Sequence, residues 1–262
     1  MLRPRIIPCL LIHDGGLVKT VGFKDAKYVG DPINAVKIFN EKEADELIVV
    51  DIDATVNGRE PDYKRIANLA AECRMPLCYG GGVRTPEQAR AIIALGVEKV
   101  AISAAALEDP TLVTRIAEEI GRQSVVVVLD HKPRTLSLSK QQDVWTHNGT
   151  RNTKRNVIDV AKEMEAAGAG EIVINSIAND GRMKGYDIAL ASKVREAVNI
   201  PVTILGGGGS LEDMHQVVAA CGVVGVAAGS FFVFKGTYRA VLISYPSAQQ
   251  KDEKVFSALQ AR

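Results

Sequence analysis

The sequence predicts a closed α/β barrel of the (βα)8 TIM type, built from two similar half-barrels. Short apolar runs rich in valine and isoleucine alternate with amphipathic segments along the 262 residues, which is typical of parallel βα units. A glycine cluster at 80–82 recurs at 206–208, and the equivalent positions Gly82 and Gly207 are 125 residues apart. Duplication of a half-barrel explains this repeat, and the length suits one barrel domain over residues 1–262.

Eight apolar runs are the expected strands, and amphipathic segments between them are the expected helices. The strands are predicted at 6–12, 47–52, 76–79, 99–102, 124–130, 171–175, 201–205 and 223–227. The helices are predicted at about 32–43, 63–72, 86–95, 110–121, 155–167, 188–198 and 211–221. Thr85 and Ser210 follow the two glycine clusters and are predicted to begin the helices there.

Three segments depart from the alternating pattern. Residues 13–30 and 131–153 follow the first and fifth strands, so we expect two long loops on the face where the barrel strands end. The polar tail at 247–262 is expected to be either a loosely attached helix or disordered chain.

Charge and cysteine content exclude several classes of protein. The 32 basic and 31 acidic residues nearly balance, which predicts no nucleic-acid or membrane partner and leaves small anions or proteins. The four cysteines, Cys9, Cys73, Cys78 and Cys221, lack metal-ligand spacing, so we expect buried reduced thiols, no metal and no cofactor. The N-terminal apolar stretch is too short for a signal peptide, and no run approaches about 18 apolar residues. A cytoplasmic protein is therefore expected.

Both glycine clusters are candidate anion sites. Each follows a short strand entered through Pro76 or Pro201, and glycine leaves backbone N–H groups bare at the turn. Two such cradles, one in each half, predict a ligand with two phosphates. The alternative is that the glycines only permit a tight turn from strand to helix.

Several motifs occur in a specific order and spacing. They are RIIPCL at 5–10, Asp14-Gly15 to Lys19, the glycines at 80–82, Asn175-Ser176 with Asp180-Gly181, and Gly206-Gly207. Together they resemble HisF, the cyclase subunit of imidazole glycerol phosphate synthase, over roughly residues 1–245. The segments 8–11, 51–55, 73–82 and 233–236 resemble more closely the HisF-like branch called WbuZ, which is associated with amidation of surface-polysaccharide sugars.

The resemblance implies a barrel that receives ammonia from a HisH-type glutaminase. In HisF the ammonia enters at the N-terminal face, crosses the core and meets a bisphosphorylated ribulosyl-formimino substrate at the C-terminal face. Four residues correspond to the salt-bridge gate at the ammonia entrance, namely Arg5, Glu46, Lys99 and Glu171. The alternative is a ring of buried ion pairs that only stabilises the barrel.

HisF uses two aspartates as proton-transfer groups, at the ends of the first and fifth strands. The fifth strand here supplies Asp130, but the first supplies Leu11. Leucine cannot transfer a proton, and loss of a general acid or base costs about two to four orders of magnitude in rate. His13 is the candidate replacement, since its pKa suits proton transfer near neutral pH. The alternatives are an exposed loop histidine and, for Asp130, a residue that caps a loop.

The resemblance also implies residues that bind substrate and phosphate. Lys19 corresponds to the lysine with which the family holds its substrate, and Asp51, Asn175 and Ser176 end strands beside the expected sugar chain. Solvation or local turn capping is the alternative for each. The first phosphate site would comprise Gly82 and Ser103, and the second Asp180, Gly181, Gly207, Gly229 and Ser230. HisF has an Asn-Thr pair where this chain has Ser103-Ala104, so the first site has lost side-chain donors.

Three functions are consistent with these residues. In the first, the chain uses ammonia from a glutaminase, with or without a third amidotransferase protein, to form an amidine on a phosphorylated or nucleotide-linked sugar of a surface polysaccharide. In the second it is the cyclase subunit of histidine biosynthesis, with Asp130 and either His13 or water as proton carriers. In the third it is a noncatalytic ammonia conduit and scaffold. The absent first aspartate and the complete gate argue against a HisA-type isomerase.

Overall fold

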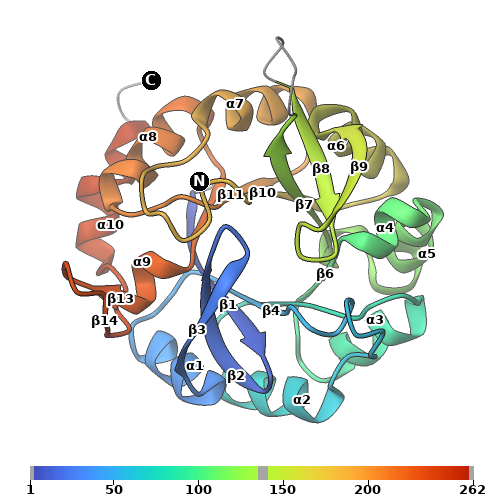
Figure 1. Ribbon diagram of the computed structural model, residues 1–262, viewed down its shortest axis with the longest axis horizontal. Coiled ribbons are helices and arrows are strands. Elements are labelled where there is room, and N and C mark those ends of the chain that lie inside the picture. Colours follow the sequence, from blue (N-terminus) through green and yellow to red (C-terminus); the bar gives the residue numbers. More distant parts are fainter. Residues whose placement is uncertain (1–2, 135–140, 260–262) are drawn as a thin grey trace.

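A closed barrel of parallel strands forms the centre of the protein (Figure 1). The computed structural model describes residues 3–134 and 141–259. Each barrel strand pairs in parallel with the next, and the last pairs with the first, which closes the sheet. The strands are, in order, β1 (Arg5–His13), β4 (Leu47–Asp51), β5 (Leu77–Gly80), β6 (Lys99–Ile102), β7 (Val125–Pro133), β10 (Glu171–Ser176), β11 (Val202–Leu205) and β12 (Gly225–Ala228). The predicted (βα)8 fold is confirmed.

Helices surround the barrel at the positions that the apolar periodicity predicts (Figure 1). They are α1 (Pro32–Glu41), α2 (Tyr63–Glu72), α3 (Pro86–Ala94), α5 (Thr111–Ile120), α6 (Val157–Ala167), α7 (Ile188–Ala197) and α8 (Leu211–Cys221). Thr85 caps α3 by accepting a hydrogen bond from the Gln88 N–H, and Ser210 caps α8 by accepting from the Asp213 N–H. The two halves therefore begin these helices in the same way.

The C-terminal region forms a further helix of the outer layer. Ser247 and Gln250 form a capping box that begins α10 (Ala248–Lys254), and a short 3-10 helix, η2 (Phe256–Leu259), follows. Lys251, Val255 and Ala258 are buried, and both elements pack against α8. The polar composition of this region does not indicate such packing, because only a few of its side chains are buried.

The two long segments that interrupt the pattern are hairpins in their described parts. After β1 the chain forms β2 (Gly16–Val21) and β3 (Lys24–Gly30), and after β7 it forms β8 (Gln142–Thr146) and β9 (Arg151–Asn156). In each case the first hairpin strand pairs antiparallel with the barrel strand before it. The two expected long loops therefore contain paired strands, and they follow the strand ends as expected. The polar side chains of these strands conceal the alternation that marks a half-buried strand.

Apolar side chains form an outer layer between sheet and helices and an inner cluster in the barrel lumen. The lumen cluster consists of small and aliphatic side chains: Ile7, Cys9, Ile48, Cys78, Ala101, Val126, Val173 and Ala227. Of the four cysteines, Cys73 is partly exposed, and the other three are buried as expected. The lumen between the two faces is therefore narrow and apolar.

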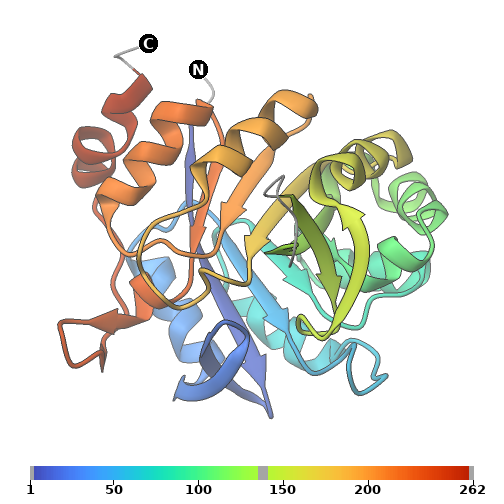
Figure 2. The ribbon, with the colours of Figure 1, turned by 45° about the horizontal axis from the view of Figure 1, so that its top comes forward.

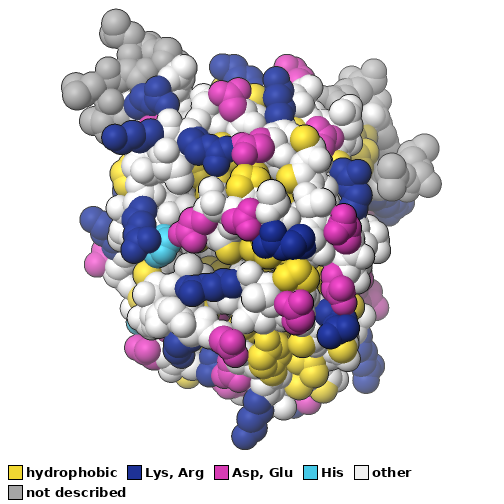
Figure 3. Space-filling view, turned by 90° about the vertical axis from the view of Figure 1, so that its right-hand side faces the viewer, with side chains coloured by type: hydrophobic (Ala, Val, Ile, Leu, Met, Phe, Trp, Pro, Cys, Tyr) yellow, Lys and Arg dark blue, Asp and Glu magenta, His cyan; other side chains and the backbone are white. Residues whose placement is uncertain are grey.

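The remaining elements are short. They are α4 (Ala104–Glu108), η1 (Arg122–Ser124), α9 (Ser230–Val233), β13 (Phe234–Lys235) and β14 (Ala240–Val241). The hairpin of β13 and β14 extends away from the barrel (Figure 2). Within the described ranges, no helix has the length and apolar character needed to cross a membrane. Basic and acidic side chains are interspersed over the face shown in Figure 3, in line with the balanced composition.

Candidate functional site

A ring of four charged side chains lies at the N-terminal face of the barrel. Arg5, Lys99 and Glu171 begin their strands, and Glu46 immediately precedes β4. The Arg5 guanidinium pairs with Glu46 and donates to Glu171 at 2.8 Å. The Lys99 ammonium donates to Glu46 at 2.9 Å and to Glu171 at 3.0 Å. These contacts bring the four residues of the expected gate together in one closed circuit of alternating charge, which we call the charged ring.

Both acids of the charged ring are deeply buried but fully partnered. Glu46 is 3% and Glu171 is 4% exposed. Burial opposes ionisation of Glu171, but Arg5 and Lys99 together with hydrogen bonds lower its pKa to about 2. The Thr203 hydroxyl donates one of these hydrogen bonds at 2.6 Å. Thr203 is thus a fifth polar member of this end, which the sequence analysis missed because it lies within an apolar run.

Two adjoining cavities open at the opposite, C-terminal face. The first lies over the ends of β4 to β7, and the second, which is smaller, lies over the ends of β10 to β12. Leu11 and Phe23 line both cavities and so lie between them. Both cavities draw residues from the two half-barrels, so the site is shared between the halves.

Asp130 lines the first cavity beside Leu11. The Asn175 amide donates to its carboxylate at 2.8 Å. Burial raises the pKa of Asp130 to about 7, although the Asn175 hydrogen bond opposes that rise. A carboxyl with such a pKa exchanges a proton readily near neutral pH, which suits a general acid or base. Leu11 leaves the corresponding position of the first strand without a titratable group.

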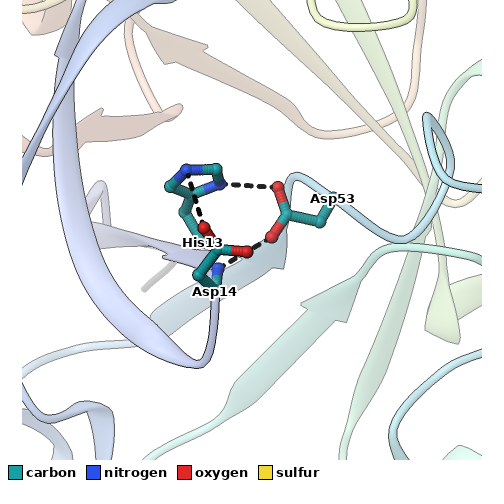
Figure 4. A group of neighbouring side chains, drawn as sticks. All are labelled: His13, Asp14 and Asp53. Carbon is teal, nitrogen blue, oxygen red and sulfur yellow. Dashed lines mark hydrogen bonds and ion pairs between the residues drawn. The ribbon is translucent and has the colours of Figure 1, made fainter.

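His13 lines neither cavity among the described residues. At the end of β1 its Nδ1 lies 2.7 Å from Asp53, and its Nε2 lies 3.4 Å from Asp14 (Figure 4). The hydrogen bond with Asp53 raises the pKa of His13. The structure therefore does not bring His13 together with Asp130, and its proposed role as a replacement proton carrier has no support from the geometry.

The group of His13, Asp14 and Asp53 offers one nitrogen and two carboxylates within reach of a single cation (Figure 4). However, the Asp14 N–H donates to Asp53 at 2.8 Å, and the Arg59 guanidinium lies 3.6 Å from the same carboxylate. Asp53 thus has positive and hydrogen-bonding partners from the protein itself. We interpret the group as a hydrogen-bonded turn that fixes the entry to the β2–β3 hairpin.

Lys19 lies on β2 and points into the protein. It is 4% exposed, lines the second cavity, and donates from its Nζ to the Cys9 carbonyl at 2.5 Å. A Cβ at Gly229 would lie 2.9 Å from this Nζ, so glycine leaves room for the lysine. Burial lowers the pKa of Lys19. The side chain is therefore not the solvated loop lysine that was the alternative.

The second cavity brings together all five residues of the predicted second phosphate site. Its lining includes Asp180, Gly181, Gly207, Gly229 and Ser230, together with Asn175. At Gly207 the backbone φ is +116°, and a Cβ would lie 2.1 Å from the Gly185 carbonyl, so only glycine fits. Ser176 is buried beside this site and does not line the cavity.

Asp180 has protein partners that the sequence did not indicate. Its carboxylate accepts from the Thr20 hydroxyl at 2.7 Å and from the Phe23 N–H at 3.1 Å. These bonds tie the β2–β3 hairpin across the second cavity. Asp180 thus holds the hairpin, and a negative carboxylate at this place would repel a phosphate rather than bind it.

The first cavity contains fewer of the predicted residues. Asp51 and Ser103 line it, whereas Gly82 lies next to the lining residues Gly80 and Gly81. The Asp51 carboxylate accepts from the backbone N–H groups of Asp53 at 2.9 Å and Ala54 at 3.1 Å, which is the predicted turn-capping alternative. The Ser103 hydroxyl is buried and has no hydrogen-bond partner among the described residues.

Two further side chains reach the first cavity, Arg84 and His147, and the sequence analysis named neither. His147 lies at the tip of the β8–β9 hairpin, where His147, Asn148 and Gly149 all have positive φ. The Asn148 amide donates to the Ile52 carbonyl at 2.8 Å and anchors the tip over the cavity. Burial and nearby Arg151 lower the pKa of His147, which keeps the ring neutral near pH 7. The sequence His-Asn-Gly is typical of a tight turn and was the available signal.

Comparisons with known proteins agree with one another. The family model described as "Histidine biosynthesis protein" matches residues 5–239. A Vibrio vulnificus protein named "Putative imidazole glycerol phosphate synthase subunit hisF3" is 55% identical over 96% of this chain and 96% of its own length. A Leptospira borgpetersenii protein named "Putative imidazole glycerol phosphate synthase subunit HisF" is 51% identical over 96% and 98%. The "Imidazole glycerol phosphate synthase subunit HisF" of Hyphomonas neptunium is 42% identical over 89% and 91%.

Proposed function

Because this chain belongs to the histidine biosynthesis protein family and, within it, to the HisF group, we propose that it is the ammonia-using synthase subunit of a glutamine amidotransferase complex. Its partner in this proposal is a HisH-type glutaminase. The observation that carries the proposal is the presence, in one barrel, of the charged ring at one face and the Asp130 cavity at the other. These are the two ends that delivery and use of ammonia require.

The lumen between the two ends suits the passage of ammonia. Cys78, Ala101 and Ala227 are small, and the other members of the lumen cluster are aliphatic. Such a lining does not solvate a cation, so it favours neutral ammonia over ammonium. The charged ring would then strip water and exclude ammonium at the entrance.

Asp130 would carry the chemistry at the far end. With a pKa of about 7 its carboxyl can accept a proton from attacking ammonia or donate one to a leaving group. Asn175 would orient the carboxylate through its hydrogen bond. Lys19 and the second cavity would hold a phosphate group of the acceptor.

We further infer that the acceptor is a phosphorylated or nucleotide-linked sugar of a surface polysaccharide, on which the complex forms an amidine. Two departures from HisF support this acceptor. Leu11 removes one of the two aspartates used in cyclisation, and Ser103-Ala104 replaces the donors of the first phosphate site. The resemblance to the WbuZ branch supports the same acceptor. A third amidotransferase protein would bind and present the sugar if the barrel alone does not.

The second candidate function is that of the cyclase subunit of imidazole glycerol phosphate synthase. The names of the relatives favour it, and His147, unlike His13, lines the same cavity as Asp130. Purified chain with ammonium chloride would then convert the bisphosphorylated ribulosyl-formimino substrate, and His147→Gln would lower that rate. Undetectable turnover by the unmodified chain would exclude this function.

The main proposal is tested by reconstitution with a HisH-type glutaminase. We expect the two proteins to copurify and the barrel to stimulate glutamine hydrolysis, with further stimulation by a nucleotide-linked sugar acceptor. Lys99→Met should change this stimulation of glutamine hydrolysis, whereas Lys193→Met, on the exposed side of α7, should not. If the barrel neither binds nor stimulates the glutaminase, the proposal fails.

A noncatalytic conduit is the remaining alternative, and Asp130→Asn separates it from the proposal. A conduit should form full product with this variant in the reconstituted system. The proposed synthase should lose about two orders of magnitude or more in product formation while glutamine hydrolysis continues.

A further inference from the structure

The two sides of the charged ring are supported by different parts of the chain. On one side Lys99 and Glu171 begin barrel strands, and Thr203 of a third barrel strand donates to Glu171. On the other side Arg5 and Asp45, the residue before Glu46, lie next to residues 245–259, which we call the C-terminal segment. The ring alone does not require this segment, so its contacts need a separate explanation.

Polar groups of the C-terminal segment bind the backbone on both sides of the Arg5–Glu46 contact. The Tyr245 hydroxyl donates to the Ile6 carbonyl at 2.8 Å and accepts from the Asp45 N–H at 3.0 Å. The Lys251 ammonium donates to the Asp45 carboxylate, and the same carboxylate accepts from the Ile6 N–H at 2.9 Å. Ile6 follows Arg5 in sequence and Asp45 precedes Glu46, so each contact acts one residue away from the ring.

The Tyr245 and Lys251 side chains of the C-terminal segment are both fixed by their contacts. Lys251 is 8% exposed, and a buried lysine must be paired to offset the loss of its hydration. The Tyr245 ring stacks on Phe232 at a centroid distance of 5.5 Å and packs edge-on against Phe39 at 6.5 Å. The Lys251 ammonium lies 5.1 Å from the centroid of the Tyr245 ring. The segment therefore presents its polar groups from a rigid platform.

We propose that Tyr245 and Lys251 are positioning residues of the charged ring, which set the place of Arg5 relative to Glu46. This inference rests on the proposed function only in treating the ring as an entrance for ammonia. A cavity of about 580 Å³ lined by Arg5, Asp45 and Lys251 joins α10 to the ring on the same face. A protein that docks over the entrance can therefore contact the helix that holds one side of it.

The interaction between Arg5 and Glu46 provides a test that uses the barrel alone. Its coupling free energy is measured by urea unfolding of Arg5→Met, Glu46→Gln and the double variant, first in the native chain and then with Lys251→Met. We expect Lys251→Met to lower this coupling by about half or more. The Lys99–Glu171 coupling, measured in the same way, should stay unchanged. Lys254→Met, an exposed lysine of the same helix, is the matched control.

Two results of these cycles would overturn the proposal. One is an unchanged Arg5–Glu46 coupling in the Lys251→Met background. The other is an equal loss of both couplings, since that would mean general loosening of the barrel. Neither result depends on glutaminase binding, so failure of the positioning role and failure of the proposed function are distinguishable.

Hydrogen exchange of the Arg5 side chain provides a second measurement if the ring variants do not fold. It needs only Tyr245→Phe and Lys251→Met, and it is followed by NMR of the guanidinium N–H groups. We expect these groups to exchange about tenfold faster or more in both variants, while the Lys99 ammonium is unaffected. Tyr238→Phe is the control, because that tyrosine is 97% exposed. Unchanged exchange at Arg5 in both variants would contradict the positioning role.

Discussion

The two ends of the barrel treat buried charge in opposite ways. At the N-terminal face every member of the charged ring meets an opposite charge, and the pKa of Glu171 is lowered to about 2. At the C-terminal face the partly buried Asp130 accepts a hydrogen bond from the Asn175 amide and forms no ion pair among the described residues, and desolvation raises its pKa to about 7. One end stabilises its ionised groups, whereas the other destabilises them.

This difference distinguishes charged side chains that hold the fold together from those that a reaction uses. Removing one member of a fully paired buried ion network leaves its partners uncompensated and costs stability. A buried ion without an opposite charge costs stability, and a protein keeps such a group where a reaction needs it. Removing a charged side chain should therefore lower the free energy of unfolding at the N-terminal face and raise it at the C-terminal face.

Glu171→Gln should have the largest effect. It leaves Arg5 and Lys99 with a single carboxylate in a buried place, so we expect a loss of ~3–5 kcal/mol in the free energy of unfolding at pH 7. Urea denaturation measures it. Glu163→Gln breaks an exposed pair with Arg155 and should cost less than about 1 kcal/mol. Equal losses of unfolding free energy in the two variants would contradict the stabilising role of the charged ring.

The pH dependence of this effect has a definite sign. Because the folded-state pKa of Glu171 is lowered from 4.5 to about 2, its ionised form stabilises the fold fully above about pH 4.5. That contribution falls as the pH approaches 2. The stability difference between native chain and Glu171→Gln should therefore shrink on acidification over this range.

Asp130→Asn should shift stability in the other direction. The pKa of Asp130 is raised from 3.8 to about 7, so ionisation costs stability in full above about pH 7 and not at all below about pH 3.8. Asparagine removes this cost, and we expect a gain of about 2–4 kcal/mol at pH 8 that disappears near pH 4. Thermal or urea unfolding at the two pH values measures it. A loss of stability at pH 8 would contradict the assignment.

The contrast between the ends was only partly visible in the sequence. Apolar periodicity located all eight barrel strands, because a parallel strand buried on both faces must be apolar throughout. The ring residues lie just before or at the start of those runs, and so the strand starts placed them on one face. Helix starts at Thr85 and Ser210 were predictable because capping is local.

Contacts between distant segments could not be read from local patterns. His13 was the candidate replacement proton carrier, but the chain turns at Asp14 and Gly15, both with positive φ, and the His13 ring forms a hydrogen bond with Asp53. The hydrogen bond from Asn175 to Asp130 joins residues 45 positions apart. Such pairings depend on barrel closure rather than on neighbours in sequence.

Lys19→Met tests whether the lysine belongs with the unpaired charges of the C-terminal face. Burial lowers the pKa of Lys19, so the ammonium costs stability that methionine, of similar shape, should recover by about 1–2 kcal/mol. The same change should weaken binding of inorganic phosphate about tenfold, measured by calorimetry. Lys24→Met, an exposed lysine of β3, should change neither quantity. If Lys19→Met is destabilised instead, the Lys19 ammonium stabilises the fold, as the members of the charged ring do.

Ser103→Ala should have the smallest effect, and it probes the first cavity. The hydroxyl is buried without a partner among the described residues, and such a group costs about 1–3 kcal/mol. Removing it should therefore raise stability by about 1 kcal/mol, whereas Ser247→Ala, which deletes the cap of α10, should lower stability by about the same amount. Urea unfolding of both variants measures these effects and shows whether the Ser103 hydroxyl lacks a partner or is hydrated. If Ser103→Ala instead behaves like Ser247→Ala, the hydroxyl has a water partner, and the first cavity is hydrated at this serine.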